Sequence, residues 1–265
     1  MSPPEAESSL RGRKASPLDL QLNPSLDVTR LAERYRDHGR IQIKDFLAPG
    51  SALAVLEELQ SLPWGLCYND GDRVVQLHAD QVAQLGNREA ADIMAGIRER
   101  ARGGYQFFYA FYPVLTAYFS PAIERRPIFE FYEFMNSPGV LDFIRQVTGL
   151  PGINWADGQA SWYKPGHFLK AHTDEAPAEV RMAAYVTNFS VDWDRDWGGF
   201  LQFFDRNGNV ELGFKPDFNM LNLFTIPAPH SVSMVSTYVT AKRLAVTGWF
   251  RGDQPPGPIG AAASG

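Results

Sequence analysis

Short runs of aromatic and β-branched residues, separated by turn signals, fill the chain from Ile153 to Arg251. The clearest turn is Asp205-Arg-Asn-Gly208, which lies between two of these runs. About eight short strands at such spacing are typical of a β-sandwich or jelly roll. The predicted strands cover residues 154–164, 168–172, 180–189, 199–204, 209–214, 220–225, 230–235 and 243–251.

The first half of the chain differs, because helical periodicity alternates there with short strand-like runs. Helices are predicted over residues 25–38, 49–62, 89–102 and 138–148, where glycine or proline follows the last turn. Strands are predicted over residues 40–46, 64–68, 73–78 and 105–112, and we read the last, aromatic-dense run as a buried strand rather than a ligand cage. The fold class is therefore α+β and mainly β, with the N-terminal helices packed on the outer sheet.

We expect one domain over residues 18–252, with helical support over residues 18–152 and a jelly-roll core over residues 153–252. A chain of 265 residues can bury a core of this size. Residues 1–17 and 253–265 lack the bulky, periodic side chains that packing requires, so both are predicted to be disordered tails.

Composition excludes several classes of function. No apolar run reaches bilayer length, and residues 1–9 lack the basic and apolar regions of a signal peptide. Cys67 is the single cysteine, so it can form no internal disulfide, and cysteine usage favours the cytoplasm. A net charge of −5 gives no reason to expect nucleic acid as a partner. The oligomeric state is not indicated.

One short motif carries metal chemistry. His172 and Asp174 lie two residues apart, so on an extended strand both side chains leave the same face. His230 follows in a later strand, and two imidazoles with one carboxylate form the facial triad that suits non-haem Fe(II). His167 has the opposite parity from His172 and is rejected as a ligand. A lone strand histidine is more often structural, so the motif alone is weak.

Arg243 strengthens the motif, because it lies inside an apolar strand, thirteen residues after His230. A buried guanidinium without a partner is costly. A 2-oxo acid that chelates the metal could present its far carboxylate to Arg243 in a bidentate pair. Thr247, four residues on, could add a hydroxyl to the same carboxylate. The alternative for Arg243 is an internal salt bridge to Asp or Glu.

The run from His172 through Asp174, His230 and Arg243 to Thr247-Gly-Trp-Phe resembles the Fe(II)/2-oxoglutarate-dependent dioxygenases of the prolyl-hydroxylase type. The tail from Arg243, with the Trp-rich turn before Gly198-Gly199, is similar to the branch that hydroxylates a ribosomal-protein proline. The resemblance covers about residues 155–252 and implies a double-stranded β-helix.

The resemblance also implies roles for named residues. His172, Asp174 and His230 would hold Fe(II), and 2-oxoglutarate and O₂ would be the co-substrates, with ascorbate as a further candidate reductant. The residues expected to contact 2-oxoglutarate are Arg243, Tyr163, Thr247 and Asn188. Asn188 departs from the pattern, since relatives often carry a tyrosine there. Tyr163 could equally be a core aromatic at a strand end.

The expected reaction is hydroxylation of an aliphatic C–H bond, with a prolyl residue in a peptide or protein as the preferred target. A free amino acid or small metabolite is the alternative substrate. Asp174 fills the position that a halide would need, which favours hydroxylation over halogenation. A non-catalytic jelly-roll protein that binds a metal or small acid, and a zinc hydrolase, are the alternatives from other classes.

Overall fold

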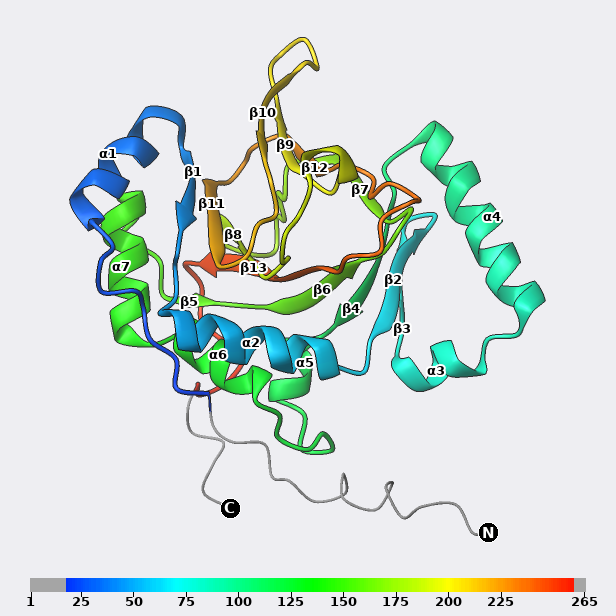
Figure 1. Ribbon diagram of the computed structural model, residues 1–265, viewed down its shortest axis with the longest axis horizontal. Coiled ribbons are helices and arrows are strands. Elements are labelled where there is room, and N and C mark those ends of the chain that lie inside the picture. Colours follow the sequence, from blue (N-terminus) through cyan, green and yellow to red (C-terminus); the bar gives the residue numbers. More distant parts are fainter. Residues whose placement is uncertain (1–17, 260–265) are drawn as a thin grey trace, which may run out of the picture.

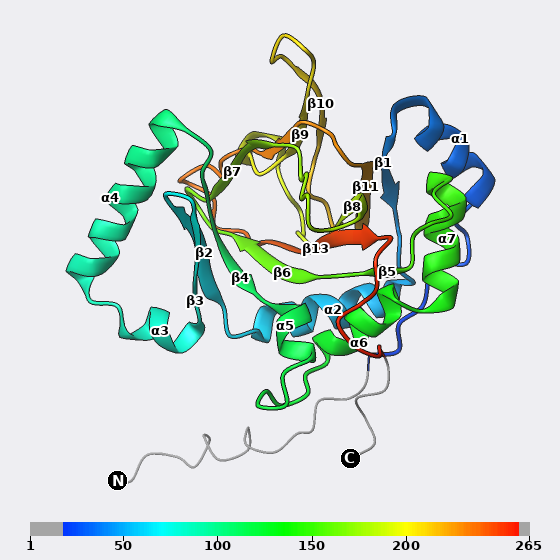
Figure 2. The same ribbon diagram turned by 180° about the vertical axis from the view of Figure 1, so that it is seen from behind.

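Two rows of antiparallel strands form the centre of the molecule in the computed structural model, which describes residues 18–259. One row has the order β11-β8-β13-β6 and the other β7-β12-β9-β10, and β4 bridges β6 and β7. Figures 1 and 2 show the sheet curling into a nearly closed jelly roll. The eight strands of the two rows are β6 (Gln159–Tyr163), β7 (Phe168–His172), β8 (Arg181–Asn188), β9 (Leu201–Phe204), β10 (Val210–Phe214), β11 (Met220–Thr225), β12 (His230–Val232) and β13 (Arg243–Arg251).

Five further strands extend this core: β1 (Arg40–Lys44), β2 (Gly65–Asp70), β3 (Arg73–Leu77), β4 (Phe107–Tyr112) and β5 (Trp155–Ala156). β1 adds to the edge of β11, and the hairpin β2–β3 adds to β4. Arg40 on β1 forms an ion pair with Glu211 on β10, so side chains join the two free edges of the sheet. The predicted jelly roll with supporting helices is confirmed.

The helices flank this sheet on three sides (Figure 1). They are α1 (Val28–His38), α2 (Pro49–Ser61), α3 (Ala79–Gln84), α4 (Asn87–Gly103), α5 (Val114–Tyr118), α6 (Ile128–Met135) and α7 (Pro138–Thr148), with a short 3₁₀ turn η1 (Arg195–Trp197). In α7 the Ser137 side chain accepts from the Val140 N–H, and Gly149 ends the helix in the left-handed region, as its sequence predicts.

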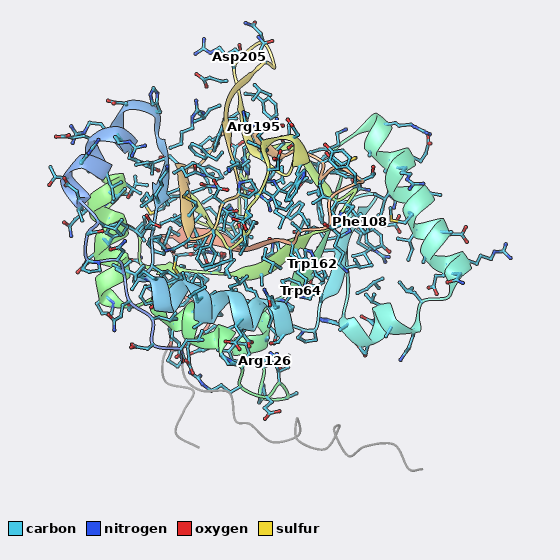
Figure 3. All side chains as sticks on the ribbon, in the orientation of Figure 1. Trp64, Phe108, Arg126, Trp162, Arg195 and Asp205 are labelled. Carbon is cyan, nitrogen blue, oxygen red and sulfur yellow. The ribbon has the colours of Figure 1, made fainter. Side chains whose placement is uncertain are left out.

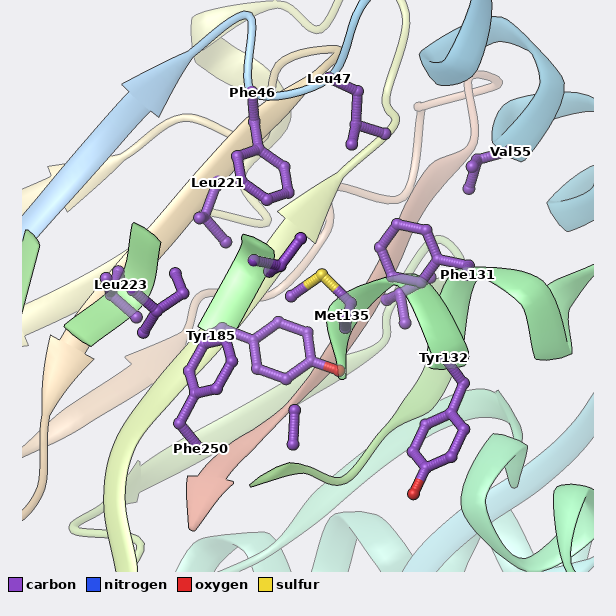
Figure 4. Close-up of a cluster of buried hydrophobic side chains, with 14 of the residues drawn as sticks. Phe46, Leu47, Val55, Phe131, Tyr132, Met135, Tyr185, Leu221, Leu223 and Phe250 are labelled. Atoms are coloured by element: carbon purple, nitrogen blue, oxygen red, sulfur yellow. The ribbon is translucent and has the colours of Figure 1, made fainter. Parts of the chain in front are cut away.

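The main hydrophobic core lies between the helices and the outer face of the β8–β11–β13 row (Figure 4). Phe131 and Met135 of α6 meet Leu221 and Leu223 of β11 there, and all four are essentially unexposed. Helix α6 was not predicted, because six of its eight residues are apolar, four of them aromatic, and this hides the helical period. Five of the eight are buried and the other three are half-buried, so α6 has no fully exposed face. The short helices α3 and α5 were missed as well.

The predicted strand 154–164 is in fact two strands, β5 and β6. Asp157 and Gly158 separate the two strands. The Asp157 side chain accepts a hydrogen bond from the Trp249 backbone N–H at 2.6 Å, which ties this side chain to the neighbouring strand β13. Gly158 packs so closely that an added Cβ would lie 3.0 Å from the Tyr185 hydroxyl. A long-range contact therefore sets this break, and no local signal reveals it.

The C-terminal boundary of the domain also differs from the prediction. Asp253 forms an ion pair with Arg251 and accepts from the Trp155 indole N–H, and Ile259 packs against the main core. Residues 253–259 are thus part of the packed structure. The predicted tail 1–17 and residues 260–265 lie outside the described residues. Between residues 18 and 259, no helix is both long and apolar enough to cross a bilayer.

Candidate metal centre

His172 and His230 are brought together by strand pairing. β7 and β12 run antiparallel with His172 directly opposite His230, and their ring centroids lie 4.2 Å apart. The two strands belong to the same row, so their register fixes the pair. The sequence names both histidines but does not give this register.

Asp174 completes the cluster from outside the strand. β7 ends at His172, and Asp174 has a φ of +62°, in the left-handed region that non-glycine residues seldom adopt. Its Oδ1 lies 3.0 Å from His172 Nε2 and its Oδ2 lies 3.4 Å from His230 Nε2. The three side chains do converge, but through a strained turn and not through the parity of an extended strand. Strain of this kind is often found at functional sites.

Both imidazoles present Nε2 to the centre. His172 Nδ1 lies 3.0 Å from the Lys170 carbonyl oxygen, and His230 Nδ1 lies 2.8 Å from that of Ala228. A carbonyl only accepts, so each Nδ1 carries the proton and each Nε2 lone pair is free for a metal. The three donor atoms lie within 4.8 Å of one another. Two neutral imidazole nitrogens and one carboxylate fit Fe(II).

The electrostatics of the cluster favour a metal over protons. Burial lowers the pKa of His230 to about 4, although the Asp174 carboxylate works in the opposite direction. Burial would raise the pKa of Asp174, but the adjacent His172 and His230 side chains outweigh burial and hold that pKa below its usual value. At neutral pH the site therefore offers a neutral His230 and an ionised carboxylate, which are the protonation states that bind metals.

A cavity of about 670 Å³ lies beside this cluster, inside the jelly roll. The β4 side chains Phe107 and Tyr109 line one wall, next to the exposed Tyr105, whose ring centroid is 5.5 Å from that of His172. Tyr109 in turn stacks on Tyr163, with centroids 5.2 Å apart. The aromatic run is thus a buried strand, as predicted, and one of its faces also forms the cavity wall.

Arg243 lies at the inner end of this cavity and is 1% exposed. Its Nε donates to the Gly199 carbonyl at 2.6 Å, and its Cζ lies 4.5 Å from the centre of the Tyr163 ring. Burial lowers its pKa to about 10, Tyr163 acts in the opposite direction, and no carboxylate from residues 18–259 contributes. The guanidinium therefore stays charged at neutral pH, and the alternative of an internal salt bridge is not seen among the described residues.

The other predicted co-substrate contacts lie at different places. Tyr163 lines the cavity, and burial holds its pKa well above the usual value, so its hydroxyl keeps the proton. Thr247 also lines the cavity, but its hydroxyl donates to the Tyr185 carbonyl at 3.0 Å. Asn188 is buried outside the cavity lining, and its amide N–H groups point to the carbonyls of Val186 and Met220. Contacts of Thr247 and Asn188 with a carboxylate remain predictions, and the observed hydrogen bonds do not favour them.

Several cavity residues were missed from the sequence. Arg181 stacks on Trp249, with Cζ 3.6 Å from the ring centre, and donates from Nη1 to the Asp174 carbonyl at 3.2 Å. Arg251 lies 3.4 Å from a carboxylate oxygen of Asp157, and burial raises the pKa of Asp157 to about 6. These side chains sit at strand ends, where an isolated charged residue gives no signal of its partner.

His167, rejected as a ligand, is buried against Phe108, with ring centroids 4.2 Å apart. Burial lowers its pKa to about 4, Lys164 acts in the same direction, and a backbone hydrogen bond with Trp162 opposes both. The ring is therefore neutral in the folded protein at neutral pH. It lies outside the metal cluster formed by the described residues.

We expect His167 to make the metal-free protein sensitive to acid. The unfolded chain takes up the proton near pH 6.5 and the folded chain near pH 4, so stability falls as pH drops through this interval, by up to about 3 kcal/mol for this residue. Urea unfolding of wild type and His167→Gln at about pH 7 and pH 4.5 measures this term. The variant should lose less stability between the two pH values, and an equal loss would exclude His167 as a cause.

Residues 158–251 match the family model of the 2OG-Fe(II) oxygenase superfamily. Over 117 residues the chain is 29% identical to the prolyl 3-hydroxylase OGFOD1 of Mus musculus, a match that covers 42% of this chain and 21% of that relative. The chain thus spans about a fifth of the length of the curated relative it matches.

Solved structures share the architecture at low sequence identity. A prolyl-4-hydroxylase from Pseudomonas putida is 20% identical with a TM-score of 0.53, covering 86% of this chain and 96% of its own. A Trichoplax adhaerens prolyl hydroxylase in complex with a hypoxia-inducible-factor peptide is 18% identical with a TM-score of 0.55, covering 85% and 89%. A 2OG-Fe(II) oxygenase family protein from Burkholderia pseudomallei is 13% identical with a TM-score of 0.56, covering 89% and 95%. At these identities the likeness concerns the fold.

Proposed function

We propose that this chain, a member of the 2OG-Fe(II) oxygenase superfamily and a 2-oxoglutarate-dependent dioxygenase, hydroxylates a prolyl residue in a peptide or protein. The observation that carries the co-substrate assignment is Arg243, a buried guanidinium at the cavity end with no carboxylate partner among residues 18–259. A dicarboxylate that reaches from the metal cluster to Arg243 would supply the missing anion.

The residues around the cavity would have different roles. His172, Asp174 and His230 would hold the iron, which couples oxidative decarboxylation of 2-oxoglutarate to insertion of one O₂ oxygen into the substrate, with succinate and CO₂ as the other products. Arg243 binds the distal carboxylate and thereby orients the co-substrate. Tyr163, protonated and stacked on Tyr109, shields the guanidinium from water.

The preference for a peptide rests on two supports. The mouse relative is a prolyl 3-hydroxylase, and the Trichoplax structure is a complex with a peptide fragment. The cavity here opens beside the exposed side chains of Tyr105 and Val74, which offer apolar surface to a chain that lies across the mouth. A free amino acid or small metabolite is the second candidate substrate. Cytoplasmic location and use of ascorbate remain predictions from the sequence.

A product screen tests the proposal. Purified protein with Fe(II), 2-oxoglutarate and O₂ is incubated with proline-containing peptides or free amino acids, and mass spectrometry follows both succinate and the +16 product. We expect +16 on a prolyl residue, succinate in step with it, and neither product with His172→Ala. Reaction of free amino acids alone would exclude the peptide preference. Absence of succinate in the wild type under every condition would favour a non-catalytic binder or a zinc hydrolase.

A further inference from the structure

The carbonyl of Gly199 holds the Arg243 side chain in place. It accepts the Arg243 Nε proton at 2.6 Å, which is the one hydrogen bond of this guanidinium to residues 18–259. Gly199 has a φ of +70°, and an added Cβ would lie 2.8 Å from Arg243 Cδ and 3.1 Å from Nε. The side chain and the glycine are therefore in close contact, and the contact has no room for a methyl group.

Gly198 fixes the peptide that precedes Gly199. Its φ is also +70°, and a Cβ there would lie 2.1 Å from the Met234 carbonyl oxygen. The Gly198 carbonyl accepts the Trp193 indole N–H at 2.9 Å, and the Gly199 N–H donates to the Ser233 carbonyl at 3.1 Å. The peptide between Gly198 and Gly199 is thus restrained at both its carbonyl and its N–H.

Trp193 is rigid enough to act as the anchor. Its side chain is 2% exposed and packs in the same buried cluster as Tyr163 and Val235. Trp197 contacts it edge-on, with ring centroids 5.3 Å apart at 89°, and Lys215 Nζ donates to the Trp193 carbonyl at 3.0 Å. The two tryptophans of the Trp-rich turn therefore pack in the cluster that also holds Tyr163, and neither of them lines the cavity.

We propose that Trp193, Gly198 and Gly199 form a clamp that positions the Arg243 guanidinium for the distal carboxylate of 2-oxoglutarate. They are positioning residues, because none of them lines the cavity and all act through Arg243. The clamp rests on the proposed use of 2-oxoglutarate. A guanidinium that binds a carboxylate bidentately must be fixed in both place and plane, and one backbone carbonyl with a stacked tyrosine supplies that restraint.

The test compares two ligands that differ only at the far end. 2-Oxopentanoate carries a methyl group where 2-oxoglutarate carries its distal carboxylate. Calorimetry of the Mn(II)-loaded protein without turnover gives the dissociation constant of each ligand. The dissociation constant of 2-oxopentanoate divided by that of 2-oxoglutarate is the ratio that reports the Arg243 contact alone. General loosening of the fold weakens both ligands and leaves the ratio unchanged.

Gly199→Ala should reduce this ratio by about tenfold or more, because misplacement of a binding group by about 1 Å costs that much or more. Gly208→Ala is the matched control. Gly208 also has a positive φ, +83°, but a Cβ there meets nothing within 4 Å, and it lies in the β9–β10 turn next to Asp205, which is labelled in Figure 3. The control therefore carries the backbone strain without the clash and should keep the wild-type ratio.

Trp193→Phe is the second variant, and it decides the question if Gly199→Ala does not fold. It removes the hydrogen bond to Gly198 but keeps an aromatic ring, and we expect the ratio to fall about threefold or more. Trp155→Phe is its control, since Trp155 is also 2% exposed and also donates one indole hydrogen bond, to Asp253 at 3.1 Å. The ratio should not change in this control.

The outcomes separate the clamp from the proposed function. A wild-type ratio near one means that Arg243 does not bind the distal carboxylate. Both the co-substrate assignment and the clamp would then be wrong. A large wild-type ratio that stays the same in Trp193→Phe and in any folded Gly199→Ala overturns the clamp alone. A reduced ratio in the variants but not in the controls supports it.

Discussion

We expect Asp174→Ala to abolish turnover and to lower iron affinity by more than about a hundredfold, because loss of a direct ligand should cost more than the 10- to 100-fold loss typical of indirect partners. The Asp174 carboxylate lies 3.0 Å and 3.4 Å from the two imidazole nitrogens, and among residues 18–259 it is the carboxylate of this cluster. Equilibrium dialysis against Fe(II), or Mn(II) under air, measures the loss. His230→Ala should give the same result.

Asp142→Ala serves as the control, because Asp142 is an exposed carboxylate on α7 that pairs with Arg145 on the same helix. It should bind iron like the wild type. Full activity or undiminished iron affinity in Asp174→Ala would remove this residue from the metal site and would leave two histidines, too few for the proposed centre.

Arg243→Ala raises the 2-oxoglutarate requirement by roughly thirtyfold to several thousandfold, since removal of one partner from a buried charged pair costs about 2–5 kcal/mol. Iron affinity should stay close to that of the wild type, because Arg243 makes no contact with the three ligands. Arg243→Lys should be intermediate, since the charge remains but the planar fork is lost. Succinate formation at varied 2-oxoglutarate measures the effect.

Arg145→Ala is the matched control for this series. Arg145 also donates from Nε to a backbone carbonyl, that of Ile153 at 2.8 Å, but it lies on α7. Its loss should leave the 2-oxoglutarate requirement unchanged. If the requirement is also unchanged in Arg243→Ala, the arginine is a structural residue and the co-substrate must bind elsewhere.

The sequence predicted the parts of the fold that local pattern specifies. β13 has the predicted bounds because its nine residues are mostly apolar or β-branched, and α7 has them because Ser137 and Gly149 mark its ends. The prediction was wrong where distant residues decide the local structure. Asp157 breaks β5 from β6 by bonding to Trp249, which is 92 residues away. Helix α6 was missed because six of its eight residues are apolar, which leaves only Glu130 and Glu133 to mark a polar face.

In the candidate site, too, local pattern predicted some features and long-range contacts decided the others. The three candidate ligands could be named because a spaced His-x-Asp with a later histidine is a local pattern, yet the reason given for their convergence was incomplete. Strand register pairs His172 with His230, and the left-handed backbone conformation of Asp174 brings its carboxylate to the two imidazoles. Asn188 was placed by counting along the motif, whereas the observed hydrogen bonds direct its amide to backbone carbonyls. The support of Arg243 by Gly199 involves a close approach that spacing does not reveal.

The Arg243 guanidinium, which has no carboxylate partner among residues 18–259, has a consequence for the stability of the protein. A charge that is buried without an anion destabilises the folded chain, so a dicarboxylate that pairs with Arg243 would add RT ln(1 + [L]/Kd) to its stability. Molecules without this ligand would unfold more often and would be cut more readily by proteases. If 2-oxoglutarate is that dicarboxylate, proteolysis of the purified protein should slow as the concentration of 2-oxoglutarate rises.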